Sequence, residues 1–197
     1  LSEQNKNQFQ NKEAGLQPQL ISEILEKVQE DIEQDTTPNY VIECYLTFIA
    51  KADNMIYMAC PEAKKKVQKE FGKGEWYCER CNKYYDKPVA TYMVTAKLSD
   101  STGALFVSFY AEQAEQLFNG FTAEEFSHIQ IHGTEDEVRD KINEFLYKPI
   151  RVLVKARQND FGHEMGNIKY FGQKVYPYKY NAHNLNIINT LKDYKPK

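Results

Sequence analysis

Stretches in which apolar and polar residues alternate do most to restrict how this 197-residue chain can fold. Such alternation predicts β-strands that bury one face. Two of these stretches, 89–99 and 104–110, flank a tight turn at 100–103 and form the clearest hairpin in the sequence. The sequence further predicts a first strand at 40–50, a return strand at 55–59 after a turn at Asp53 and Asn54, and a second strand pair at 150–157 and 167–176.

Helical patterns lie before, between and after these strands. The apolar residues of 20–32 recur at helical spacing, which predicts an amphipathic helix. Between the strand pairs, 111–118 has the pattern of a short helix, and Thr122 to Glu125 and Thr134 to Glu137 are two capping boxes that each open a further helix. The C-terminal segment carries a narrow apolar stripe on a predicted helix, formed by Ala182, Leu185, Ile188 and Leu191.

This order of elements predicts the fold class. Three strands, a helix and two strands is the order of an OB-fold, a small five-stranded Greek-key barrel whose open face binds oligonucleotides. We therefore expect a mainly β protein with helices (α+β), with the barrel domain at 20–180. Within it we expect an inserted cysteine module at 60–87 and a helical excursion at 111–147. Residues 1–19 are expected to form a flexible lead-in, and 181–197 a C-terminal helix for core packing or subunit assembly.

The charges are segregated along the chain, although the net charge is only −3. Residues 1–39 carry 3 basic and 8 acidic groups (net −5), and residues 111–147 carry 2 and 9 (net −7). By contrast, residues 60–87 carry 8 basic and 5 acidic groups (net +3), and residues 148–180 carry 7 and 2 (net +5). Because a polyanion responds to the face that it meets, nucleic acid is a candidate partner. The alternative is that these blocks are simply solvated faces.

The sequence does not favour a membrane protein. No run approaches the roughly 18 apolar residues of a membrane span, and the N-terminus lacks the basic and apolar regions of a signal peptide. Leu1 is not a natural start, so we expect the chain to be cut from a longer one.

Three of the four cysteines lie close together in the sequence, which indicates a metal site rather than disulfides. Cys78 and Cys81 form a C-x-x-C knuckle, and Cys60 can supply a third thiolate from an opposite turn. A zinc ribbon has four ligands as a rule, and no second cysteine follows Cys60. The fourth ligand could be His163 or Cys44, or water or Glu62, or the module could lack metal and be held by packing around Trp76, Tyr77 and Tyr84. Cys44 lies in an apolar strand, so a buried core thiol is its simpler interpretation.

Alternation sorts the strand residues into two faces. The residues expected to point inward are Val94, Ala96, Leu98, Leu105, Val107, Phe109, Ile150, Val152, Val154, Ile168 and Tyr170. The outward set mixes aromatic rings with cations, which is what single-strand binding requires: rings stack on bases and cations follow the phosphates. Alternatively, the outward rings merely cover the barrel beneath the helical excursion. The candidate DNA-binding residues are Lys97, Phe106, Tyr110, Lys155, Arg157, Phe161, Lys169 and Phe171.

Catalysis is not expected. The sequence contains none of the nucleotide-binding, metalloprotease or hydrolase motifs, namely G-x-x-x-x-G-K-[ST], G-x-G-x-x-G, H-E-x-x-H and G-x-S-x-G. Asp160, Glu164 and Lys169 could be imagined as a nuclease-like set, but their spacing fits no such motif.

The chain resembles the C-terminal DNA-binding domain of the large subunit of replication protein A. The residues that carry the resemblance are Tyr57-Met-Ala-Cys60-Pro61, Lys64-Lys-Lys-Val67, Trp76-Tyr-Cys-Glu-Arg-Cys81, Phe109-Tyr-Ala-Glu-Gln-Ala-Glu115 and Arg151-Val-Leu-Val-Lys155. The resemblance implies an OB-fold with a zinc ribbon inserted after the first strand. It also implies binding of single-stranded DNA, and a C-terminal helix that joins a three-helix bundle with two smaller subunits.

The resemblance also assigns individual residues. Tyr110 matches a stacking aromatic at the end of the third strand, and Phe161 falls near another in the last hairpin. Cys60, Cys78 and Cys81 match three of four zinc ligands. The missing fourth ligand suggests a divergent paralogue, similar to the telomeric one that serves in the telomerase holoenzyme. A nuclear protein acting on G/T-rich telomeric DNA is therefore expected. The alternative is a subunit-assembly module with weak or no DNA binding of its own.

Overall fold

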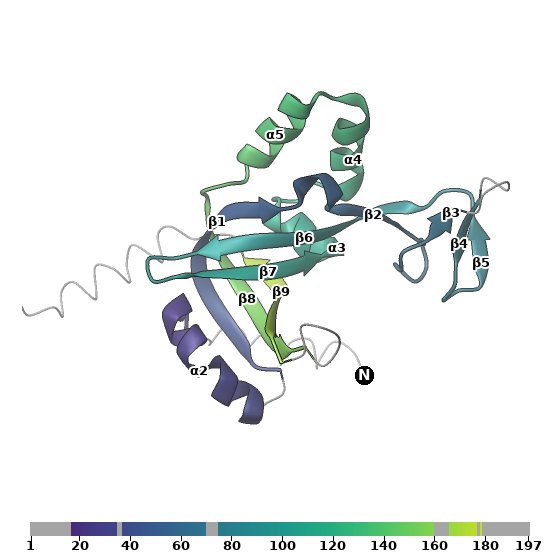
Figure 1. Ribbon diagram of the computed structural model, residues 1–197. Coiled ribbons are helices and arrows are strands. Elements are labelled where there is room, and N and C mark those ends of the chain that lie inside the picture. Colours follow the sequence, from purple (N-terminus) through teal and green to yellow (C-terminus); the bar gives the residue numbers. More distant parts are fainter. Residues whose placement is uncertain (1–16, 35–36, 70–74, 160–165, 177, 179–197) are drawn as a thin grey trace, which may run out of the picture.

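The computed structural model describes residues 17–34, 37–69, 75–159, 166–176 and 178. Five strands close into a barrel in the order β1-β8-β9-β7-β6 and back to β1 (Figure 1). All neighbours are antiparallel except β7 and β9, which are parallel. The predicted α+β OB-fold barrel is therefore confirmed. Its strands are β1 (Asn39–Ala50), β6 (Val89–Ser99), β7 (Ala104–Tyr110), β8 (Pro149–Gln158) and β9 (Ile168–Tyr176).

Strand β1 is shared between the two halves of the barrel. Its first half pairs with β8 and its second half with β6. The pairing register with β6 shifts between Leu46 and Phe48, which is a β-bulge. As a result Leu46 is buried, whereas the Phe48 side chain, two residues later, is 52% exposed.

A strand is present at 56–59, but the prediction that it reverses the direction of the chain is wrong. The observed β2 (Ile56–Ala59) follows a short 3-10 turn at Ala52–Asn54 and continues along the same partner strand as β1. Ala50 pairs with Thr95, and Ile56 then pairs with Tyr92 further along β6, so both segments run antiparallel to β6. The chain therefore steps around an interruption and does not reverse.

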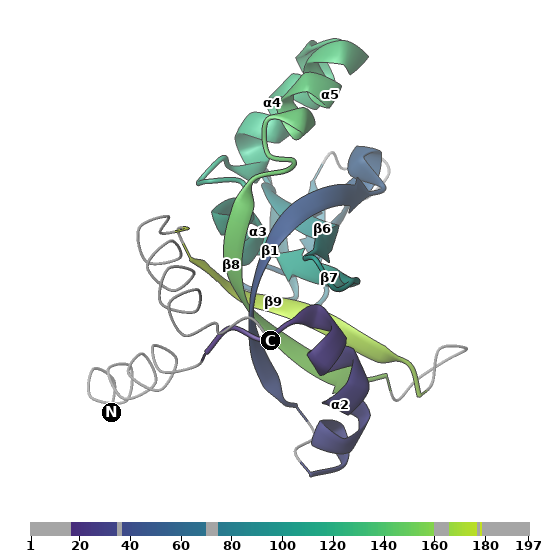
Figure 2. The ribbon, with the colours of Figure 1, turned by 90° about the vertical axis from the view of Figure 1, so that its left-hand side faces the viewer.

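Helix α2 (Ile21–Gln34) packs its apolar stripe against the lower part of the barrel (Figure 2). The buried residues are those of the helical spacing in the sequence, and they include Ile21 and Ile24. The hairpin turn between β6 and β7 binds the start of this helix. The Ile21 N–H donates to Asp100 Oδ2 at 2.8 Å, and the Ser22 N–H donates to Thr102 Oγ1 at 3.1 Å.

The helical excursion forms α3 (Ala111–Leu117), α4 (Ala123–His132) and α5 (Glu135–Asn143), and we call the α4–α5 pair the acidic arm. Both predicted capping boxes are confirmed. Thr122 Oγ1 accepts from the Glu125 N–H at 3.2 Å, and the Glu125 carboxylate accepts from the Thr122 N–H at 2.8 Å. Thr134 and Glu137 repeat this exchange at 3.2 and 2.7 Å. The acidic arm stands above the barrel in Figure 1.

The barrel core contains the inward residues that alternation predicts. Nine of the eleven are buried, and Ile150 and Ile168 are half-buried and pack against the same cluster. The fit is tight at Gly172, where an added Cβ would collide with the Phe109 ring. No helix in the described part of the chain is both long and apolar enough to cross a membrane.

Candidate nucleic-acid interface and metal centre

The outside of the barrel carries side chains that align across neighbouring strands. Residues that pair across strands place their side chains on the same side of the sheet. Phe48 pairs with Lys97, and Lys97 pairs with Phe106, so these three align across β1, β6 and β7. Phe171 of β9 pairs with Lys155 of β8 and continues this surface. We call it the outer face, and its large or charged members are Phe48, Met93, Lys97, Phe106, Tyr110, Lys155, Arg157, Lys169 and Phe171.

The aromatic rings of the outer face are accessible. Phe106 is 54% exposed and Tyr110 is 42% exposed. The rings of Tyr110 and Phe171 lie with their centroids 6.5 Å apart and their planes within 24° of parallel. Lys97 Nζ lies 6.0 Å from the centroid of the Phe106 ring. A planar ligand can therefore meet both rings and positive charge on one surface.

The charge of the four strands β6 to β9 is entirely positive. They contain Lys97, Arg151, Lys155, Arg157, Lys169 and Lys174, and no aspartate or glutamate. On β1, Glu43 forms an ion pair with Arg151, with 3.6 Å between Oε1 and Nη1. The acidic residues of 111–147 lie instead on α3 to α5, except Glu144, which directly follows α5. The surface potential therefore differs between the strands and the helical excursion.

The structure brings seven of the eight predicted DNA-binding residues onto this one surface. Phe161, the eighth, lies outside the described residues, as do His163 and the stripe of the C-terminal helix. The members of the outer face that were predicted are Lys97, Phe106, Tyr110, Lys155, Arg157, Lys169 and Phe171.

Sequence reasoning missed three residues at this surface. Met93 is 49% exposed, and its alternation with Lys97 could have revealed it. Phe48 could not be found this way, because strict alternation places it on the buried side with Leu46 and only the bulge turns it outward. Tyr57 lies beside the outer face, where burial and then the neighbouring Tyr110 raise its pKa.

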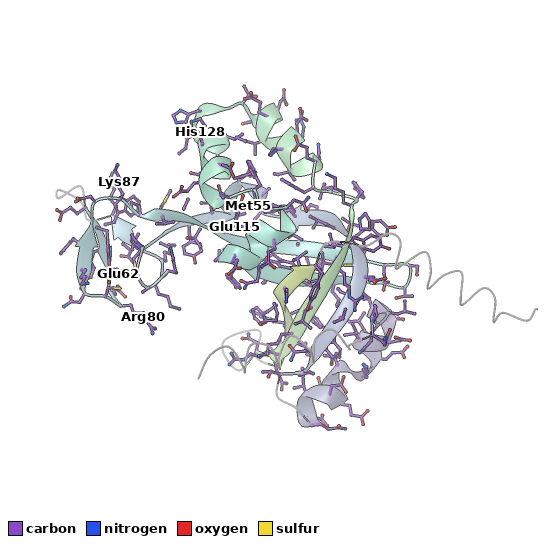
Figure 3. All side chains as sticks on the ribbon, turned by 180° about the vertical axis from the view of Figure 1, so that it is seen from behind. Met55, Glu62, Arg80, Lys87, Glu115 and His128 are labelled. Atoms are coloured by element: carbon purple, nitrogen blue, oxygen red, sulfur yellow. The ribbon has the colours of Figure 1, made fainter. Side chains whose placement is uncertain are left out.

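The cysteine module is a small separate sheet that projects from the end of β2 (Figure 1). Its strands are β3 (Gln68–Lys69), β4 (Trp76–Cys78) and β5 (Lys83–Tyr85), in the order β3-β4-β5. Figure 3 shows Glu62, Arg80 and Lys87 on this module, apart from Met55 in the barrel. Cys60, Val67 and Cys78 form its small buried core.

The three thiols of the module converge in a geometry that suits a metal ion. The sulfur atoms of Cys60, Cys78 and Cys81 lie within 4.8 Å of one another, and those of Cys60 and Cys81 are 3.7 Å apart. Zinc–sulfur bonds of about 2.3 Å in a tetrahedron require sulfur–sulfur separations of about 3.8 Å. The three thiols are free rather than disulfide-bonded. Burial opposes ionisation of Cys60, but hydrogen bonds, first that from the Ala63 N–H, lower its pKa.

Two of the suggested fourth ligands do not reach this cluster. Cys44 is buried in the barrel core, where burial raises the pKa of its thiol, so its interpretation as a core thiol is confirmed. Glu62 is exposed and pairs with Lys83, with its two carboxylate oxygens 3.1 and 3.2 Å from Nζ. The rings of Tyr77 and Tyr84 pack with centroids 5.0 Å apart on the same module.

Comparisons with known proteins relate the sequence to replication protein A. The sequence matches the Replication factor-A C terminal domain family over residues 40–187. It is 29% identical to replication factor A protein 1 of Schizosaccharomyces pombe over 171 residues, covering 85% of this chain and 27% of that protein. It is 30% identical to a replication protein A 70 kDa DNA-binding subunit of Oryza sativa subsp. japonica over 131 residues, covering 66% of this chain and 20% of that protein. The chain thus spans only about a quarter of the length of these relatives.

Solved structures share the fold at lower identity. A replication protein A heterotrimer bound to single-stranded DNA matches with a TM-score of 0.79 and 18% identity, over 91% of this chain and 40% of that chain. Yeast replication protein A bound to single-stranded DNA matches with a TM-score of 0.73 and 21% identity, over 90% of this chain and 97% of that chain. With the sequence match over most of its length, the chain belongs to the Replication factor-A C terminal domain family.

Proposed function

We propose that this domain binds single-stranded DNA across the outer face. The observation that carries the proposal is that exposed rings and cations share the outer face. The four strands β6, β7, β8 and β9, which supply most of this face, contain no acidic residue. Two of the matching structures are of replication protein A bound to single-stranded DNA, which supports the same ligand here.

The residues divide into two roles. Phe106, Tyr110 and Phe171 offer ring faces on which unpaired bases stack. The cations beside them neutralise phosphates: Lys97, Lys155, Arg157 and Lys169. In a duplex the bases are already stacked on one another, so the rings have no free base to meet. Single strands are therefore the favoured ligand. Phe161 joins the stacking set in this proposal because of its match to the family.

The cysteine module is proposed to hold zinc. A three-thiolate set with sulfur spacing close to that of a tetrahedral zinc centre supports this ion. Such a centre would supply no chemistry to the DNA. It would fix the turns of a module whose buried core is too small to stabilise it alone.

The cellular role proposed here is that of a nuclear telomeric paralogue of replication protein A, acting on G/T-rich single strands within a telomerase holoenzyme or a replication protein A-like complex. Its support is the divergence of the metal-site sequence from the family pattern. In the same proposal the barrel domain spans 20–180, and the helix at 181–197 contacts the smaller subunits. A preference for a G/T-rich strand over oligo-dT would support the telomeric assignment, and equal binding would contradict it.

Assembly is the second candidate function. The family match extends to residue 187 and so includes Ala182 and Leu185, two of the four residues of the apolar stripe. A domain used mainly for assembly would bind its partner subunits with the outer face unoccupied.

Photocrosslinking tests the proposed DNA path. The full chain is bound to a single strand with bromodeoxyuridine at every third position, irradiated, and analysed by peptide mass spectrometry. Crosslinks at Phe106, Tyr110 or Phe171 are the expected result. Crosslinks confined to the acidic arm, or none at saturating DNA, would refute the outer face as the binding site.

A further inference from the structure

The first turn of the cysteine module places an alanine where a second knuckle cysteine belongs. Cys78 and Cys81 are three residues apart, which is a usual ligand spacing, and Cys60 and Ala63 have the same spacing. The Ala63 N–H donates to Cys60 Sγ at 3.0 Å, and the Lys64 N–H donates to the Cys60 carbonyl at 3.0 Å. This turn therefore has knuckle-like hydrogen bonding although it supplies only one thiol.

A phenol lies beside the thiols on the opposite strand. Tyr85 ends β5, pairs with Trp76 of β4 and packs against the module core of Cys60, Val67 and Cys78. Its hydroxyl oxygen is buried and makes no hydrogen bond of good geometry among the described residues, and the group it interacts with there is the Cys81 thiol. Leaving a buried hydroxyl without a well-formed hydrogen bond has a cost in free energy. A group with that cost next to three thiols indicates that a partner is missing from the cluster.

The charge around the module suits an anionic donor set. Three thiolates and one phenolate on a divalent ion leave a net charge of −2, and Lys64, Lys65 and Lys66 lie within a few residues of Cys60. Glu62 does not compete for the position, because it pairs with Lys83.

We infer that the Tyr85 phenol replaces the missing thiolate, so that the metal ion of this module is held by Cys60, Cys78, Cys81 and Tyr85. The inference rests on the zinc proposed above. Binding then releases the phenol proton together with those of the thiols, and the fourth bond is a metal–oxygen bond.

Three variants of the full chain test this assignment. Tyr85→Phe removes the oxygen and keeps the ring, Ala63→Cys supplies a fourth thiol, and the double variant combines both. Zinc affinity is measured by competition with a chromophoric chelator, and ultraviolet difference spectra report tyrosinate. Cobalt spectra report the number of thiolate donors. Circular dichroism checks that each variant is folded.

The expected results separate the oxygen donor from a packing role. Zinc should induce a tyrosinate signal in the wild type that Tyr85→Phe lacks, and this substitution should weaken affinity at least roughly tenfold. In the Ala63→Cys background, the cobalt spectrum should become that of four thiolates. There, Tyr85→Phe should no longer change the affinity.

Two results would overturn the inference while leaving zinc in place. One is unchanged zinc affinity in Tyr85→Phe together with no tyrosinate signal in the wild type. The other is loss of affinity in His163→Ala, which would make that imidazole the fourth donor. A wild-type chain that binds no zinc would instead refute the zinc proposal itself, and the inference with it.

Discussion

Replacing Tyr110 with alanine should weaken single-strand binding without disturbing the fold. The ring is 42% exposed at the end of β7, so its removal leaves no cavity in the core. The strand pairing of residue 110 with Met93 is made by the backbone and does not depend on the side chain. The effect should therefore fall on the ligand rather than on stability.

The magnitude follows from what the ring offers. One base stacked on an aromatic side chain is stabilised by about 1–3 kcal/mol. That range corresponds to a Kd about 5- to 140-fold higher for Tyr110→Ala. Because Phe171 lies 6.5 Å away with its plane within 24° of parallel, part of the platform remains, and we expect the lower half of the range.

Fluorescence anisotropy of a labelled oligo-dT measures this effect. Tyr110→Phe keeps the ring and should bind nearly as the wild type does. Ile131→Ala serves as the matched control, because it removes a 68% exposed apolar side chain from the acidic arm. An affinity within twofold of wild type for a folded Tyr110→Ala protein would refute the stacking argument.

Three further perturbations follow from the same structure. Lys155→Ala should weaken binding to all sequences and lower the slope of log K against log salt by about 0.7; an unaltered slope would remove this lysine from the phosphate path. Gly172→Ala forces a methyl group into the Phe109 ring and should cost about 1–3 kcal/mol of stability in denaturant unfolding, whereas Gln173→Ala on the exposed side should cost little. Partial burial alone would raise the pKa of Asp100, but the hydrogen bonds from the Ile21 N–H and the turn lower it below its ordinary value. A carboxyl group whose pKa is lowered by folding stabilises the fold at pH values above its ordinary pKa, near 3.9. This stabilisation is lost as the pH falls through the lowered pKa. Asp100→Asn should therefore show a shallower decrease of Tm below about pH 4, and an unchanged profile would contradict the linkage.

Local patterns predicted most of the barrel. The strands at 89–99 and 104–110 were predicted to the residue, because alternation and a tight turn both mark their ends. The two capping boxes were equally clear, since each is a reciprocal pair of hydrogen bonds encoded within four residues.

What the sequence could not predict depends on partners distant in the chain. The bulge that exposes Phe48 is defined by its register with Lys97, and nothing local to 40–50 encodes it. The same is true of β2, whose direction depends on its pairing with β6 rather than on the turn-forming residues Asp53 and Asn54. At the candidate metal centre, spacing predicted three thiols, but the position of Tyr85 beside them depends on how β5 folds back onto β4.

Affinity for single-stranded against duplex DNA tests the central claim most directly. Labelled oligo-dT, a G/T-rich telomere-like strand and a duplex of equal length are titrated with the full chain at two salt concentrations. We expect tight binding to both single strands, weaker binding to the duplex, and loss of affinity as salt rises. Equal affinity for strand and duplex, or no binding to any of the three, would contradict this expectation.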